Sequence, residues 1–292
     1  MFIRCKFLLS VVFLLSLVLP VFSFEPSGGV LMLDGEDDYA ILPLAEHGYI
    51  FPRNTDAFTA EVWFYPKSRP EPGEKGIILR QQVAFGLRAS DCRGRVGKKD
   101  QVCSYGSAYL EGAARGVTGI DAVIKMDQWN YMAVIFTDST FYLAHNDQIV
   151  NGGKWDIMNV VAAELHVRDE FKNFFVGGYV EKSYFHGAID AIRFSDIARY
   201  DLPAEEGISP FEPPHRFSSD AHTLVLWDFN DEEGADRFED ESGNGYTLIG
   251  MNGAITFGGA GVNLGGAPED GLEIRPNTSL ATTWGQVKSE SF

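Results

Sequence analysis

The chain has 292 residues, of which 45% are hydrophobic and 22% are charged, a composition typical of a folded globular protein. Its 41 acidic and 24 basic residues give a net charge of −17, which argues against nucleic acid and anionic lipid as partners, because both attract basic surfaces. Aromatic residues make up 13% of the chain and there are 31 glycines, a combination that favours β-structure with tight turns.

Residues 1–23 have the layout of a signal peptide. Arg4 and Lys6 supply the positive start, residues 7–19 form an almost unbroken apolar run, and Pro20 ends it. The run is short for a membrane span and nothing basic follows it, so we expect cleavage after Ser23 rather than a membrane anchor. No later segment is apolar enough to cross a bilayer. The sequence therefore predicts a secreted or extracytoplasmic protein with no transmembrane segment after cleavage.

The body of the chain is predicted to form short β-strands. Residues 58–65 alternate in polarity, with Glu61, Trp63 and Tyr65 on an amphipathic face and the other face apolar. The apolar face, expected in the core, comprises Phe58, Ala60, Val62 and Phe64. Further strands are expected over residues 76–80, 83–87, 129–136, 141–145, 149–150, 174–177, 188–194, 223–229 and 246–249.

No segment of about 12 residues has convincing helical periodicity. We therefore predict an all-β fold with two antiparallel sheets in a sandwich or jelly roll. It is expected to form a single domain over residues 24–257. Residues 258–292 are Gly-rich and then polar, and we expect them to be a tail.

Two cysteines remain after the expected cleavage. Cys5 leaves with the signal peptide, and Cys92 and Cys103 flank a polar loop. In an oxidising compartment this pair favours a disulfide, which would stabilise the fold by about 2–3 kcal/mol. A zinc site is disfavoured because no histidine or second cysteine pair lies nearby.

Five segments, taken in order along the chain, resemble the motifs of one family. They are residues 33–40 (LDGEDDYA), 58–66 (FTAEVWFYP), 127–133 (DQWNYMA), 185–194 (FHGAIDAIRF), and 227–229 (WDF) followed by 240–245 (DESGNG). Together they are similar to laminin-G-like, concanavalin A-like jelly-roll domains of exported bacterial proteins. Tyr131 stands where that family usually has histidine, and Ala191 replaces an acidic residue. The last motif often opens such domains, so its position here suggests a strand that completes the sandwich from the other end.

The resemblance also suggests a structural calcium ion shared by the first and last strands. Asp34 lies on the expected first strand, just before a turn. Asp190 has the same strand parity as the apolar Ile192 and Phe194, and a buried carboxylate needs hydrogen bonds, a counter-charge or a metal. Asp34 and Asp190 are therefore the candidate metal ligands. The alternative is that Asp190 accepts backbone hydrogen bonds near a turn.

Catalytic motifs are absent from the sequence. The Glu-x-Asp-x-x-Glu strand of jelly-roll glucanases is missing, and so are a nucleophile elbow, a zinc-protease helix and a phosphate loop. Most groups of neighbouring acidic residues fall in expected loops, where solvated charges are the ordinary interpretation. We therefore expect no enzymatic activity, and a glycoside hydrolase with carboxylates from distant loops is the least supported alternative.

Aromatic residues beside polar ones favour carbohydrate binding, because sugars stack their CH faces on rings and present hydroxyls to nearby polar groups. The amphipathic face of residues 58–65 supplies both elements, although such a face can instead pack under a loop or a second sheet. The candidate ligand-binding residues are Glu61, Trp63 and Tyr65 on this strand, and Tyr105, Tyr109 and Trp155 in or near expected loops.

The sequence thus predicts a non-catalytic module that binds a glycan or a cell-surface or matrix component. The alternative is a protein-interaction or matrix module that binds no glycan. The fold class alone does not decide between them, because this fold carries lectins, adhesion modules, hydrolases and passive spacers.

Overall fold

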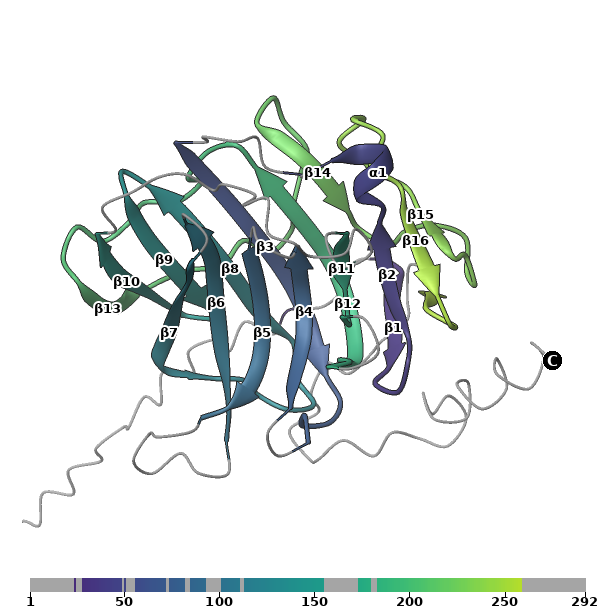
Figure 1. Cartoon of the computed structure of the whole chain (residues 1–292), viewed down its shortest axis with the longest axis horizontal. Helices are drawn as coiled ribbons and strands as arrows, with labels where there is room; N and C mark the ends of the chain where they lie inside the picture. Colours follow the sequence, from purple (N-terminus) through teal and green to yellow (C-terminus); the bar gives the residue numbers. More distant parts are fainter. Residues whose placement is uncertain are drawn as a thin grey trace, which may run out of the picture.

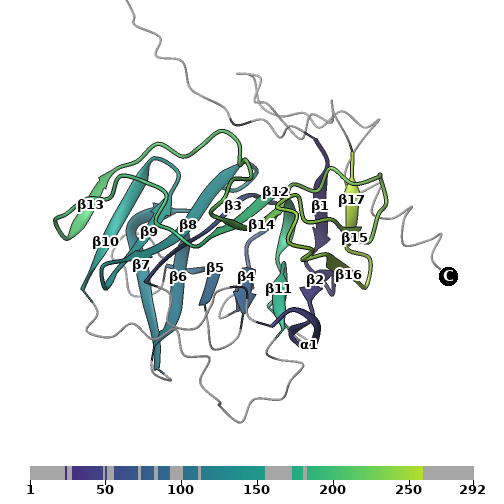
Figure 2. The same cartoon turned by 90° about the horizontal axis from the view of Figure 1, so that it is seen from above.

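The computed structural model describes residues 24, 28–48, 50, 56–71, 74–81, 85–92, 101–110, 113–154, 173–179 and 183–258. In this part of the chain, two antiparallel sheets pack face to face, which confirms the predicted all-β sandwich (Figure 1, Figure 2). The expected signal peptide and nearly all of the expected tail lie outside the described residues. No helix among the described residues is long and apolar enough to span a membrane.

The first sheet, called sheet A, has the strand order β13-β10-β9-β8-β3-β12-β1-β17, with β14 also paired to β12. Its strands are β1 (Val30–Asp34), β3 (Ala57–Pro66), β8 (Asn130–Thr137), β9 (Thr140–His145), β10 (Gln148–Lys154), β12 (His186–Ser195), β13 (Gly207–Pro210), β14 (Thr223–Trp227) and β17 (Ile255–Phe257).

The second sheet, called sheet B, has the strand order β15-β16-β2-β11-β4-β5-β6-β7. Its strands are β2 (Tyr39–Leu42), β4 (Lys75–Gln81), β5 (Phe85–Asp91), β6 (Val102–Leu110), β7 (Ala113–Val123), β11 (Phe174–Val176), β15 (Arg237–Phe238) and β16 (Leu248–Met251). One helical turn, α1 (Leu44–His47), follows β2.

The core lies between the two sheets and contains the predicted apolar face of β3. Phe58, Ala60, Val62 and Phe64 are at most 1% exposed and belong to one cluster with residues of sheet B. Strict alternation along β3 therefore predicted correctly which side chains face the partner sheet.

The two ends of the described chain close the sandwich together. β1 pairs with β17 at the edge of sheet A, and β2 pairs with β16 in sheet B. The acidic residue of the closing motif fixes this region, because the Asp240 carboxylate accepts the backbone N–H groups of Leu226, Ser242 and Tyr246 at 2.9–3.1 Å. The expectation that the last motif completes the sandwich is borne out by these pairings.

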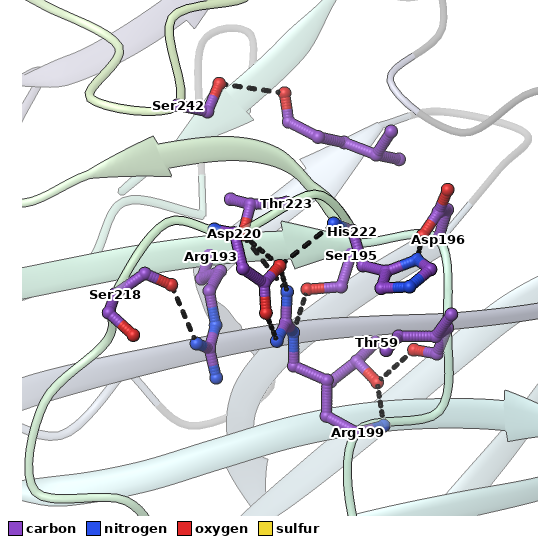
Figure 3. A network of polar contacts seen from close by, with 12 residues as sticks. Thr59, Arg193, Ser195, Asp196, Arg199, Ser218, Asp220, His222, Thr223 and Ser242 are labelled. Carbon is purple, nitrogen blue, oxygen red and sulfur yellow. Dashed lines mark hydrogen bonds and ion pairs between the residues drawn. The ribbon is translucent and has the colours of Figure 1, made fainter.

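Residues 196–222 form a strap over the outer face of sheet A. The strap leaves β12, adds β13 to the edge strand β10 and returns to β14. Thr59 Oγ1 donates to the Ile197 carbonyl at 2.7 Å, and Arg193 Nη1 donates to the Ser218 carbonyl at 3.1 Å (Figure 3). These bonds join the strap to β3 and β12, two neighbouring strands in the interior of the sheet.

A disulfide joins Cys92, which follows β5, to Cys103 at the start of β6. The two cysteines are 11 residues apart, and a closed loop of this size stabilises a fold by about 3 kcal/mol. The cross-link lies at the end of the sandwich that also carries the pocket described below.

Candidate functional site

A pocket of about 340 Å³ opens at one end of the sandwich, where β1, β3 and β5 end and β4, β6 and β12 begin. This volume lies at the lower end of the range typical of small-molecule sites. We call it the end pocket. Its apolar lining comes from Ala89, Val102, Ile124, Met126 and Phe185, and its polar lining includes Glu36, Ser68, Arg69, Glu71, Glu74, Lys75 and His186.

His186 is a half-buried polar residue of the end pocket. Its Nδ1 atom lies 2.9 Å from Ser68 Oγ. Burial lowers the pKa of His186 below its usual value of 6.5, and the nearby Asp34 carboxylate offsets this only in part. The imidazole is therefore neutral at neutral pH, with one ring nitrogen a donor and the other an acceptor, and Nδ1 uses one of these functions on Ser68.

Gly35 allows the turn after β1 to lie against His186. Its φ is +77°, and a Cβ atom at this position would lie 2.5 Å from His186 Cβ. A larger residue would push the two segments apart, so the glycine holds the Asp34–Asp38 turn beside the end pocket.

This turn, residues 34–38, gathers three carboxylates. Asp34 Oδ1 accepts the backbone N–H groups of Glu36, Asp37 and Asp38 at 2.8–3.3 Å, which fixes the turn. One oxygen each from Asp34, Asp37 and Asp38 lies within 4.8 Å of the others. Oxygens at that spacing can surround a calcium ion with bonds of about 2.4 Å, so the triad could hold a metal.

Asp190 does not join this triad, which corrects the predicted pairing of Asp34 with Asp190. Asp34 pairs with His186 across the β1–β12 ladder, and Asp190 lies four residues further along β12. Four residues span about 13 Å of strand, too far for one ion. The register of β12 against β3 also shifts between Ile189 and Ala191, and this irregularity breaks the alternation from which an inward Asp190 was predicted.

Glu61 is buried in an ion pair, whereas the sequence placed it on a sugar-binding surface. It is 0% exposed, and its Oε1 atom accepts Arg193 Nε and Nη2 at 2.7 Å. Its Oε2 atom accepts the Tyr131 hydroxyl at 2.8 Å and the Tyr200 hydroxyl. Burial, and then the Glu61 charge, raise the pKa of both phenols, so they remain donors.

Trp63 and Tyr65 share the outer face of β3 with Glu61, as expected, but they are only 6% and 4% exposed. The Phe24 ring stacks on Trp63 with centroids 3.8 Å apart and planes 9° apart. Trp129 stands edge-on to Phe24 at 5.4 Å and to Tyr65 at 5.5 Å. We call Trp63, Tyr65 and Trp129 the aromatic platform.

Of the other candidate residues, the structure describes the side chain of Tyr105 alone. Tyr105 lies within β6 of sheet B rather than in a loop, with the Arg88 guanidinium 5.3 Å from its ring centroid. Trp155 and the side chain of Tyr109 lie outside the described residues.

Sequence reasoning did not select His186, Ser68, Phe24 or Trp129. His186 and Trp129 do lie in motifs that carry the family resemblance, and Phe24 is the first residue after the expected cleavage site. Membership of a motif and position at the cleavage site are the sequence features that could have drawn attention to these residues. Neither feature shows what each side chain contacts.

No family model and no curated relative matches the chain. Among solved structures, a Bacteroides ovatus protein to which carbohydrate binding is attributed has a TM-score of 0.51 at 15% identity, over 80% of this chain and 60% of that one. The chain thus spans about three-fifths of that protein. Domains LG4–5 of the mouse laminin α1 chain match with a TM-score of 0.34 at 14% identity, over 64% of this chain and 47% of that one.

An alginate lyase from Alteromonas sp. 272 matches with a TM-score of 0.28 at 13% identity, over 54% of this chain and 75% of that one. Identities this low inform on the fold alone. The fold is a concanavalin A-like jelly roll, a fold class that carries both binding modules and enzymes.

Proposed function

We propose that this jelly-roll domain is a secreted, non-catalytic carbohydrate-binding module and that the end pocket is its ligand site. The observation that carries the proposal is the pocket's mixed lining. Buried apolar side chains lie beside a neutral histidine, a serine hydroxyl and several charged groups. A sugar ring needs such a combination, because its CH face is apolar and its hydroxyls require donors and acceptors.

The charges of the pocket favour a neutral sugar. Glu36, Glu71 and Glu74 outnumber Arg69 and Lys75 in the lining, and the whole chain carries −17. A sulfated or uronic-acid ligand would meet net repulsion at this site. The Bacteroides ovatus neighbour adds support at the level of the fold.

The test is a glycan array probed with residues 24–292, followed by affinity measurements. We expect binding to one class of neutral sugar and a loss of about tenfold in affinity for His186→Gln, which corresponds to one lost hydrogen bond of about 1.4 kcal/mol. His222→Gln is the matched control, because His222 is 53% exposed and lies on the strap outside the pocket lining. Folded protein that binds no glycan would refute the proposal and favour a protein-interaction module.

We also propose that the Asp34–Asp38 turn binds calcium beside the ligand. Calcium at about 100 times its Kd would stabilise the fold by about 2.7 kcal/mol and raise the melting temperature by several degrees. Asp37→Asn should abolish this shift, whereas Asp201→Asn, an exposed carboxylate on the strap, should leave it unchanged. Melting curves in calcium and in EDTA measure the effect, and identical curves for the unaltered protein would rule the site out.

A further inference from the structure

We propose that the aromatic platform is a second sugar-binding subsite, which Phe24 covers in the ligand-free protein. The inference rests on the proposed function, since it assigns a further subsite to the same carbohydrate ligand. Its ligand class is a neutral oligosaccharide that presents an apolar CH face and at least one hydroxyl acceptor. Three features of the platform carry the argument.

The first feature is the way Phe24 occupies the platform. Its ring lies parallel to Trp63 at a centroid distance of 3.8 Å, the position that a stacked sugar ring would take. Phe24 follows the expected cleavage site directly, so in the mature protein it is the terminal residue. A terminal residue leaves its site at a lower cost than a residue within a strand does.

The second feature is an unsatisfied donor. The Trp129 indole Nε1 atom is buried and has no hydrogen-bond partner. By contrast, the indole N–H of Trp63 donates to the Pro214 carbonyl at 3.0 Å, and that of Trp227 donates to the Tyr246 carbonyl at 2.6 Å. A buried unpaired donor costs about 1–3 kcal/mol, and the phenyl ring of Phe24 offers no acceptor. A sugar hydroxyl in place of Phe24 would supply one.

The third feature is the polar edge of the platform. Lys67 Nζ lies 5.8 Å from the Tyr65 ring centroid and pairs with Asp127 at 3.0 Å. Burial, and then the Asp127 charge, raise the pKa of Tyr65 to about 12, so its phenol remains a donor. Polar groups beside a stacking surface are what a sugar requires for orientation as well as contact.

The platform also lies next to the end pocket. Tyr65 belongs to the platform, and Pro66, the next residue of β3, lines the pocket. Successive side chains of a strand point to opposite faces, so an oligosaccharide with one residue in the end pocket passes around the end of β3 to reach the platform, where it competes with Phe24.

The test uses residues 24–292 and the sugar selected on the array, in forms of one to four residues. We expect Phe24→Ala to raise the affinity for the longer forms about tenfold, as it would if the platform is open about one-tenth of the time in the unaltered protein. The same variant should show saturable quenching of tryptophan fluorescence by the sugar. The double variant Phe24→Ala, Trp129→Phe keeps an aromatic ring at position 129 but removes the indole N–H. It should therefore abolish the gain in affinity that Phe24→Ala alone produces. Ile208→Ala, which truncates an exposed apolar residue on β13, is the control.

Circular dichroism establishes that each variant is folded, and Phe24→Leu, which retains an apolar side chain, replaces Phe24→Ala if the latter unfolds. Unchanged affinity in the Phe24 variant, or a gain that survives Trp129→Phe, would overturn the platform proposal. In that case, binding that still depends on His186 leaves the proposed function standing. Failure of every folded variant to bind any sugar would overturn both proposals.

Discussion

Replacing Glu61 with glutamine is expected to lower the free energy of unfolding by about 3–5 kcal/mol. Glu61 is 0% exposed and its partner Arg193 has a side chain that is 7% exposed. Glutamine keeps the size of the side chain but removes its charge, so the guanidinium remains buried without a counter-charge. Urea unfolding followed by circular dichroism measures the loss.

The same substitution should loosen the strap. Arg193 donates to the Ser218 carbonyl at 3.1 Å (Figure 3). Its guanidinium also lies 4.9 Å from the Phe217 ring centroid, so the ion pair with Glu61 fixes the residue that anchors residues 217–218. Burial opposes the charge of Arg193, but the Glu61 carboxylate more than compensates and raises the pKa of Arg193. We therefore expect faster proteolysis within residues 196–222 in the Glu61 variant.

Two controls separate the ion pair from a general effect of substitution. Glu205→Gln removes an exposed carboxylate from the strap and should change stability by less than about 0.5 kcal/mol. Glu61→Leu combined with Arg193→Met replaces both ions by apolar groups and should recover part of the loss, because it removes the desolvation cost of the ion pair but also the acceptor of the Tyr131 and Tyr200 hydroxyls. If the free energy of unfolding of Glu61→Gln lies within about 1 kcal/mol of that of the unaltered protein, the Glu61–Arg193 ion pair does not stabilise this region.

The burial of Glu61, Trp63 and Tyr65 could not be read from the sequence. Alternation identified the two faces of β3 correctly, but it gives no information on what covers the outer one. The strap covers Glu61 and Trp63, and it bonds Thr59, Trp63 and Arg193 through residues that lie 25 to 151 positions away in sequence. Tyr65 packs instead beside Trp129 and Met32. The strap is acidic and rich in proline, a composition that indicates an exposed loop as readily as a covering segment.

Two other differences have local causes. β6 and β7 were missed because residues 102–110 and 113–123 contain several glycines and polar residues and lack a clear apolar alternation. Strict alternation along the strand predicts that the Asp190 side chain points inward with Ile192 and Phe194. The register of β12 against β3 shifts at this residue, so the alternation does not hold there. Asp34, predicted as a metal ligand, lies in an acidic group with the nearby Asp37 and Asp38 rather than with Asp190.

The closing motif, by contrast, predicted a structural role that can be tested at Trp227. Its side chain is 0% exposed and stacks on Phe174 of sheet B, with centroids 5.6 Å apart. It also meets Phe194 of β12 edge-on at 6.1 Å. Its indole N–H donates to the Tyr246 carbonyl at 2.6 Å, just before β16. One residue therefore links both sheets to the segment that leads into the C-terminal strands β16 and β17, which complete them.

Trp227→Ala is expected to lower the free energy of unfolding by about 3–5 kcal/mol, because it leaves a cavity between the sheets and an unpaired carbonyl. Trp227→Phe keeps a ring against Phe174 but loses the donor, and it should cost about 1–2 kcal/mol. Urea unfolding of the two variants separates packing from hydrogen bonding. Equal losses in both would show that the bond to Tyr246, rather than the volume of the ring, holds the C-terminal strands in place. A larger loss for Trp227→Ala than for Trp227→Phe, as expected, would show that Trp227 acts chiefly by filling the core. The strands β16 and β17 would then close the sandwich over a packed side chain.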